Sequence, residues 1–145
     1  MYAIECSFNK LKDIISFMKM ENISMDLFSV TVVDQSVFLR DKRRYFPEII
    51  DGGEFHIFAD HPYVFERLIL LVNPRNDQQS PVYTRDDFEH SCCEMVILVY
   101  DAAYIEVYVK KFQFCETLYQ NAIRNNAENL ILKVDRDDMR QHFHV

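Results

Sequence analysis

Two apolar stretches decide the fold of this chain: Leu-Ile-Leu-Leu-Val (68–72) and Met-Val-Ile-Leu-Val (95–99). Each has the length of a β-strand, and neither leaves a polar face for solvent. A strand of this kind is covered on both sides by other parts of the protein. We therefore predict strands at 64–72 and 94–100, with the second of them central in a sheet.

The segment that follows, 104–109, alternates between apolar and polar side chains, which is typical of a strand with one covered face. One set is expected to point into the core: Ile105, Val107 and Val109. The other set is expected to point outward: Tyr104, Glu106 and Tyr108.

Helices are predicted by apolar spacing of three to four residues and by capping residues. The clearest lies at 111–124, with one apolar stripe made of Phe112, Cys115, Leu118, Tyr119, Ala122 and Ile123. Another is capped by Ser7 and ends at Asn22, and a third is opened by the capping-box pair Thr84 and Asp87. The segment 51–60 is ambiguous between a short helix, which we prefer, and a strand at 54–59.

The remaining strands are predicted at 2–6, 130–134 and, as an edge strand, 140–145. Residues 26–33 and 36–40 are predicted to form a hairpin that turns at Asp34 and Gln35. Strands and helices are mixed along the chain, with no linker and no internal repeat. The predicted fold class is therefore α+β: a mixed or antiparallel sheet with helices packed on one face, in a single two-layer domain over residues 1–145.

The charge balance argues against two classes of partner. The chain has 16 Lys and Arg against 23 Asp and Glu, a net charge of −7. Such a surface repels nucleic acid and anionic membranes. The basic cluster Arg40, Lys42, Arg43 and Arg44 is expected to be a solvated loop. No apolar run reaches the ~18 residues of a membrane span, and the first residues do not resemble an export signal, so we expect a cytoplasmic protein.

Residue counts also exclude several kinds of site. The only two glycines, Gly52 and Gly53, are adjacent, so neither a phosphate-binding loop nor a GxSxG nucleophile elbow is present in the sequence. The four cysteines contain no CxxC pair, which argues against a zinc ribbon or a redox dithiol. No cofactor is expected.

From residue 68 onward the chain resembles a small family of uncharacterised proteins from spore-forming Gram-positive bacteria. The resemblance is carried by Leu-Ile-Leu-Leu-Val (68–72), Asp87-Phe88 with Cys93, Val-Ile-Leu-Val (96–99) with Asp101, Leu-Tyr-Gln-Asn-Ala (118–122), Glu128-Asn129, and Asp-Arg-Asp-Asp (135–138) with Arg140. It implies a small bacterial cytoplasmic protein and brings no catalytic residues with it.

Three groups of residues are candidate sites. Tyr104, Glu106 and Tyr108 are candidates for binding, because tyrosines give a rigid amphipathic contact area; the alternative is that a helix covers them or that they pair across strands. His142 and His144 have an H-x-H metal-ligand spacing, against the alternative of two exposed histidines on an edge strand. Cys92 and Cys93 near His90 suggest a thiol–imidazole pair, but burial of Cys93 would oppose it.

The function favoured by these features is a non-catalytic protein-interaction domain, which either self-associates or serves as the acidic partner of another protein. The alternative is a small-ligand- or metal-binding domain, or an enzyme whose pocket forms only in the folded chain.

Overall fold

The computed structural model describes residues 1–37, 47–60, 65–75 and 81–145. Seven strands form one antiparallel sheet in the order β3-β2-β4-β5-β6-β1-β7. Their bounds are β1 Tyr2–Ser7, β2 Phe28–Val37, β3 Ile49–Asp51, β4 Phe65–Pro74, β5 Met95–Tyr100, β6 Tyr104–Val109 and β7 Glu128–Lys133. The helices are α1 Leu11–Met18, α2 Phe55–Phe58, α3 Arg85–His90 and α4 Phe112–Arg124, with 3-10 turns η1 Met25–Leu27, η2 Gly52–Glu54 and η4 Arg136–Asp138.

The two apolar stretches that open the sequence are neighbours in the middle of the sheet. Strands β4 and β5 pair antiparallel, with Ile69 opposite Leu98 and Leu70 opposite Ile97. All four of these side chains are buried. The predicted α+β class is thus confirmed, and the sheet is antiparallel.

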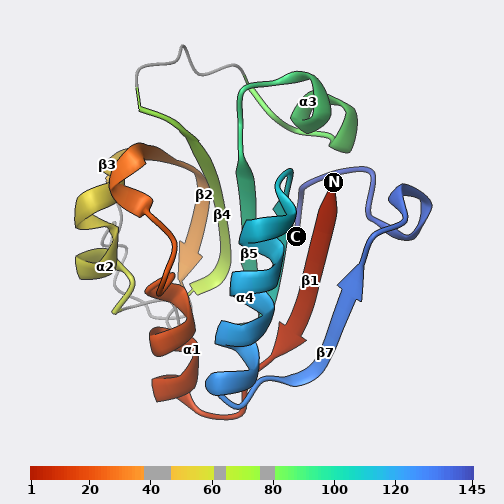
Figure 1. Cartoon of the computed structure of the whole chain (residues 1–145). Coiled ribbons are helices and arrows are strands. Elements are labelled where there is room, and N and C mark those ends of the chain that lie inside the picture. The colour runs from red at the N-terminus through yellow and green to blue at the C-terminus, as the bar shows by residue number, and fades with distance from the viewer. Residues whose placement is uncertain (38–46, 61–64, 76–80) are drawn as a thin grey trace.

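Alternate residues of these strands enter two separate apolar clusters, one on each face of the sheet. The larger cluster takes Leu68, Leu70 and Val72 from β4 and packs them against α1 and α4. In Figure 1 both helices lie in front of the sheet. The helical side chains that fill this cluster are Ile14, Phe17, Met18, Cys115, Leu118 and Ala122.

The opposite face carries the second cluster, which takes Ile69 and Leu71 from β4. It is covered by Phe88 of α3 and by Met139 and Phe143 of the C-terminal segment. The expectation that the helices pack on one face therefore needs correction. A sheet whose central strands are apolar on both sides needs cover on both sides, and α3 supplies part of the second cover.

Two predictions about the strands are wrong. The hairpin at Asp34 and Gln35 does not exist, because β2 runs through this point with Asp34 opposite Ile69 and Gln35 opposite Leu68. Residues 140–145 form no strand; their only ladder contact described is an isolated bridge between Thr84 and His142. The predicted cluster at 40–44 lies outside the described residues.

Other local predictions are confirmed. Thr84 and Asp87 form the capping box of α3, with each side chain bonded to the backbone N–H of the other residue. The segment 51–60 begins with the turn η2 and continues as α2, and the Asp51 side chain accepts from Gly53 N–H at 3.0 Å. Among the described residues, no helix is long and apolar enough to cross a membrane.

Gly52 fixes the close approach of η2 to the start of β2. A Cβ atom placed on Gly52 would lie 1.8 Å from the Met25 carbonyl oxygen and 2.5 Å from that of Phe28. Both obstacles are backbone atoms, so they cannot turn away as a side chain can. A Cβ on Gly53 would meet nothing closer than the Asp51 carboxylate, at 3.5 Å.

We predict that Gly52→Ala destabilises the chain by about 1–3 kcal/mol or more, because the methyl group forces the backbone apart. Gly53→Ala is the matched control and is expected to change stability by less than about 1 kcal/mol. Urea unfolding of the two variants compares them directly. Equal stability of the two would show that η2 and β2 are not held in contact.

Candidate functional site

The most highly connected polar group on the second face of the sheet is the carboxylate of Glu106. The Glu106 side chain is buried within β6, with only 5% of the residue exposed. Arg140 approaches it with two nitrogens, Nε 2.7 Å from Oε2 and Nη2 2.9 Å from Oε1. A buried carboxylate needs such a partner, because losing its water is costly.

Two tyrosines complete this cluster. Tyr100 donates its hydroxyl to Glu106 Oε1 at 3.1 Å, and Tyr108 donates to Oε2 at 3.4 Å. Burial and the nearby Glu106 charge raise the pKa of Tyr100 to about 12, and the same two causes raise the pKa of Tyr108. Both hydroxyls therefore stay protonated near neutral pH, which suits them as hydrogen-bond donors and not as bases.

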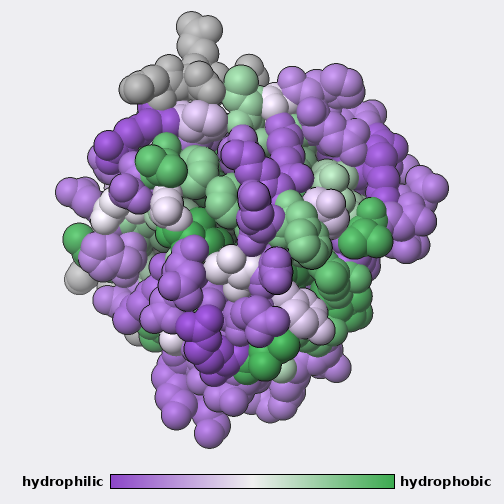
Figure 2. All heavy atoms as spheres, viewed as in Figure 1, coloured by the Kyte–Doolittle hydropathy of each residue, from purple (hydrophilic) through white to green (hydrophobic). Residues whose placement is uncertain are grey.

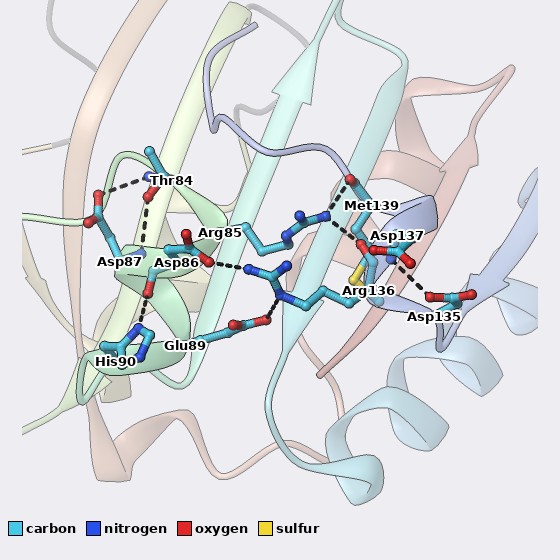
Figure 3. A network of polar contacts seen from close by, with 10 residues as sticks. All are labelled: Thr84, Arg85, Asp86, Asp87, Glu89, His90, Asp135, Arg136, Asp137 and Met139. Carbon is cyan, nitrogen blue, oxygen red and sulfur yellow. Dashed lines mark hydrogen bonds and ion pairs between the residues drawn. The ribbon is translucent and has the colours of Figure 1, made fainter.

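Arg140 belongs to the C-terminal segment, which is held against α3 by polar contacts (Figure 3). Arg85, buried at the start of α3, donates to the carbonyl oxygens of Met139, at 2.9 Å, and of Arg136. Arg136 in turn bonds Glu89 at 2.8 Å and pairs with Asp86. Two arginines thus hold the C-terminal segment against α3. Arg85 reaches from the helix to the segment, and Arg136 reaches from the segment to the helix.

The three predicted binding residues lie in different environments. Tyr104 is exposed and stacks on Tyr100, with ring centroids 5.5 Å apart and planes 9° apart. Glu106 and Tyr108 are buried, so the expectation that they face solvent is wrong. As predicted, Glu106 and Tyr108 point to the face of the sheet opposite the one that α1 and α4 cover. On that face, however, Phe143 covers Tyr108, with the two ring centroids 4.9 Å apart.

The predicted metal pair is close in space. The rings of His142 and His144 have centroids 5.8 Å apart. Within the parts of the chain that the structure describes, no group of three or more His, Cys, Asp or Glu side chains gathers as metal ligands do. His142 lines a cavity of about 280 Å³ with Thr84, Arg85, Asp86, Arg136 and Gln141.

The thiol candidates separate into a buried and an exposed group. Cys93 is buried and its sulfur lies 3.2 Å from the Met95 carbonyl oxygen, and burial raises its pKa to about 11. Cys92 is exposed. His90 uses Nδ1 on the Asp86 carbonyl oxygen, 2.8 Å away. A protonated thiol is a poor nucleophile, so Cys93 has the properties of a core residue.

A second cavity, of about 290 Å³, lies beside the Glu106 cluster and is lined by Glu66, Arg67, Tyr100, Asp101, Arg140, His144 and Val145. Its two arginines are already paired, Arg67 with Asp34 at 2.8 Å and Arg140 with Glu106. Both arginines of this cavity are therefore already paired within the protein.

The sequence analysis missed a different surface. Five apolar side chains on α4 and at β7 are between 42% and 62% exposed. Ile131 lies on the other face of the sheet, and we call the remaining four the β7 surface: Phe112, Ile123, Leu132 and Val134. Figure 2 shows apolar side chains on the side of the molecule where Figure 1 places α4, β1 and β7. The other large exposed apolar residues are distributed over many elements. The sequence did contain a signal for this surface, because Phe112 and Ile123 belong to the apolar stripe predicted for α4.

The β7 surface also lies at a sheet edge. Strand β7 is last in the strand order, so one of its sides pairs with β1 and the other meets no strand among the described residues. An edge of this kind presents backbone N–H and C=O groups that another strand can pair with.

These features define an antiparallel α+β protein with a paired, buried polar cluster and an apolar sheet edge. The chain belongs to the family described as "Protein of unknown function (DUF2691)", whose model matches residues 3–144. The likeness thus extends well beyond the predicted 68–145. No solved structure matches the chain.

Among known proteins the chain is similar to the uncharacterized protein YncE of Bacillus subtilis (strain 168). The two are 30% identical over 99 residues, which cover 68% of this chain. The matched region spans 65% of YncE, slightly less than two thirds of its length. The family and this relative assign no specific function.

The burial of the thiols gives a direct prediction. We expect a thiol reagent at pH 8 to modify Cys92 rapidly and Cys6, Cys93 and Cys115 slowly, because burial raises the pKa of each of these three and shields its sulfur. Cys92→Ser should remove the fast phase, and denaturant should make the remaining thiols react. A fast phase that survives in Cys92→Ser would show a second accessible thiolate.

The Glu106–Arg140 pair gives a stability prediction. Arg140→Met leaves a buried carboxylate without its cation and is expected to destabilise the chain by about 2–4 kcal/mol. The matched control is Lys19→Met, whose partner Asp60 is exposed, so its loss is expected to cost less than about 1 kcal/mol. Urea unfolding measures both, and similar losses would mean that Glu106 is hydrated in solution.

Proposed function

We propose that this chain is a non-catalytic protein-interaction domain that binds its partner through the free edge of β7 and the β7 surface beside it. The observation that carries the proposal is the combination of a strand edge that is unpaired within the described part of the chain with exposed apolar side chains on and beside the same strand. Exposed apolar patches next to a free strand edge mark places where another chain docks.

The polar cluster supports this proposal over an enzyme or ligand-binding domain. Glu106 is the only acid described within hydrogen-bond distance of Arg140, Tyr100 and Tyr108 together, and its oxygens are all engaged. A general base or nucleophile needs a free lone pair aimed at a substrate. A carboxylate neutralised by an arginine and two hydroxyls is suited to holding the structure together.

We also propose that the domain works in the cytoplasm of a spore-forming bacterium, beside its protein partner and away from nucleic acid and membrane. The four cysteines are free thiols, which is usual in a reducing compartment. The net charge of −7 disfavours phosphate backbones and anionic lipids. The B. subtilis relative supports the bacterial source.

The proposal is tested by placing a photo-crosslinking amino acid at single positions of the chain in living cells. At Leu132 we expect adducts of higher mass after irradiation, because this side chain would lie within the interface. The matched control is Ile57, an apolar residue of α2 with 56% exposure that lies away from β7, where we expect no adduct.

A third position, Tyr104, distinguishes the two candidate surfaces of the sheet. Adducts from Tyr104 and none from Leu132 would move the interaction to the tyrosine face and contradict the β7 surface. Adducts from none of the three positions would contradict an interaction domain that acts through either surface.

A further inference from the structure

We infer that the strand that pairs with β7 is β7 of a second copy of this chain, related by a two-fold axis that passes beside Leu132. This inference rests on the proposed function and deepens it by naming the partner. The pairing would join two seven-stranded sheets into one continuous antiparallel sheet. Two-fold pairs with the same patch on both chains are the commonest form of assembly.

The faces of the strand limit the possible registers. Leu132 pairs with Ile4 of β1, which packs in the helix-side cluster, whereas Ile131 pairs with Glu5 on the other face. In a two-fold antiparallel pair the axis is perpendicular to the sheet, so both copies present the same face on the same side. Opposed residues share a face, so each residue can oppose only one an even number of positions away.

One of the permitted registers matches the side chains best. With Leu132 opposite its own copy, Leu130 lies opposite Val134, so that every helix-side contact of the pair is apolar on both chains. On the other face Ile131 lies opposite Lys133, with no like charges opposed.

The neighbouring registers fit less well. An axis at Lys133 places two ammonium groups opposite one another, and directly opposed like charges destabilise a strand pair. An axis at Ile131 places Val134, which is 62% exposed, opposite the irregular start of β7 at Glu128, where it has no apolar partner. The charge and hydropathy pattern of this short strand therefore matches a second copy of itself.

The features that usually protect an edge strand do not block the outer side of β7. Natural edge strands are commonly blocked by a lysine or by a bulge. Here the Lys133 ammonium is drawn onto the sheet by Glu5, with Nζ 2.9 Å from Oε1. The irregularity in the pairing with β1 falls between Glu5 and Ser7, and Asn129 has a positive φ of 53°, so the bulge is confined to the start of β7. The rest of the strand, as far as Lys133, is extended and keeps a regular register with β1.

The first test is the mass of the purified chain across a range of concentrations, by light scattering or sedimentation. We expect twice the 17.4 kDa chain mass at high concentration. Leu132→Lys places two cations across the axis and should raise the dimer dissociation constant about tenfold or more. Ile57→Lys introduces the same charge at another exposed apolar residue, 56% exposed against 42% for Leu132, and should leave the dimer intact. Circular dichroism checks the fold of both variants.

The second test measures the register. In a Cys92→Ser background, Leu132→Cys places two thiols opposite one another and should give a disulfide-linked dimer on mild oxidation. Ile131→Cys and Leu130→Cys, whose copies are offset along the strand, should crosslink far less. Crosslinking that is strongest at Ile131 would overturn the proposed axis.

The two proposals fail in different ways. A chain that remains monomeric at every concentration, while Leu132 crosslinks in cells to a protein of another mass, overturns the second copy and leaves the interaction domain standing. A chain that is monomeric and forms no adduct at Leu132 overturns both. Adducts of twice the chain mass in cells, together with a dimer in vitro, support both.

Discussion

The pairing of β4 with β5 is the constraint on which the rest of this structure depends. Both strands are apolar on both faces, so the sheet is stable only if each face is covered. The helices α1 and α4 cover one face with a continuous apolar layer. The other face is covered from two distant parts of the chain, α3 and the C-terminal segment. Neither part is large enough to bury its own apolar side chains, and each depends on being held to the other.

The need to hold α3 and the C-terminal segment together explains the polar groups on the second face of the sheet. The C-terminal segment is irregular, so its backbone carbonyls lack ladder partners, and Arg85 satisfies two of them. The same segment also contains Arg140. It buries the Glu106 carboxylate and places the Arg140 guanidinium beside it. Perturbed tyrosines and a buried acid are often signs of an active site. In this chain the same signs follow from fastening a segment over a sheet, because each charge is neutralised by a partner within the protein.

The sequence predicted features that depend on neighbouring residues and missed those that depend on distant ones. The apolar runs predicted β4 and β5, and the pair Thr84 and Asp87 predicted the cap of α3, because these signals act within one element. The turn expected at Asp34 failed because β4, thirty residues later, offers this segment a strand to pair with. The alternation of β6 correctly divided its two faces, yet it carried no information on whether Phe143 would cover Tyr108. The exposure of β7 was missed for the same reason, because the position of a strand at an edge is a property of the whole sheet.

With most of both faces covered, the edges of the sheet remain as places where another strand can pair, and the two edges among the described residues differ. At one end β3 has three residues, and a strand this short gives another chain few backbone groups to pair with. At the other end β7 has six residues, with apolar side chains on the helix side and a lysine drawn inward by Glu5. The cover of the helix-side cluster also ends here, since Phe112 and Ile123 of α4 remain exposed next to the strand. This apolar edge is the feature on which the proposed interface rests, and its side-chain pattern allows a second copy of the strand to pair with it.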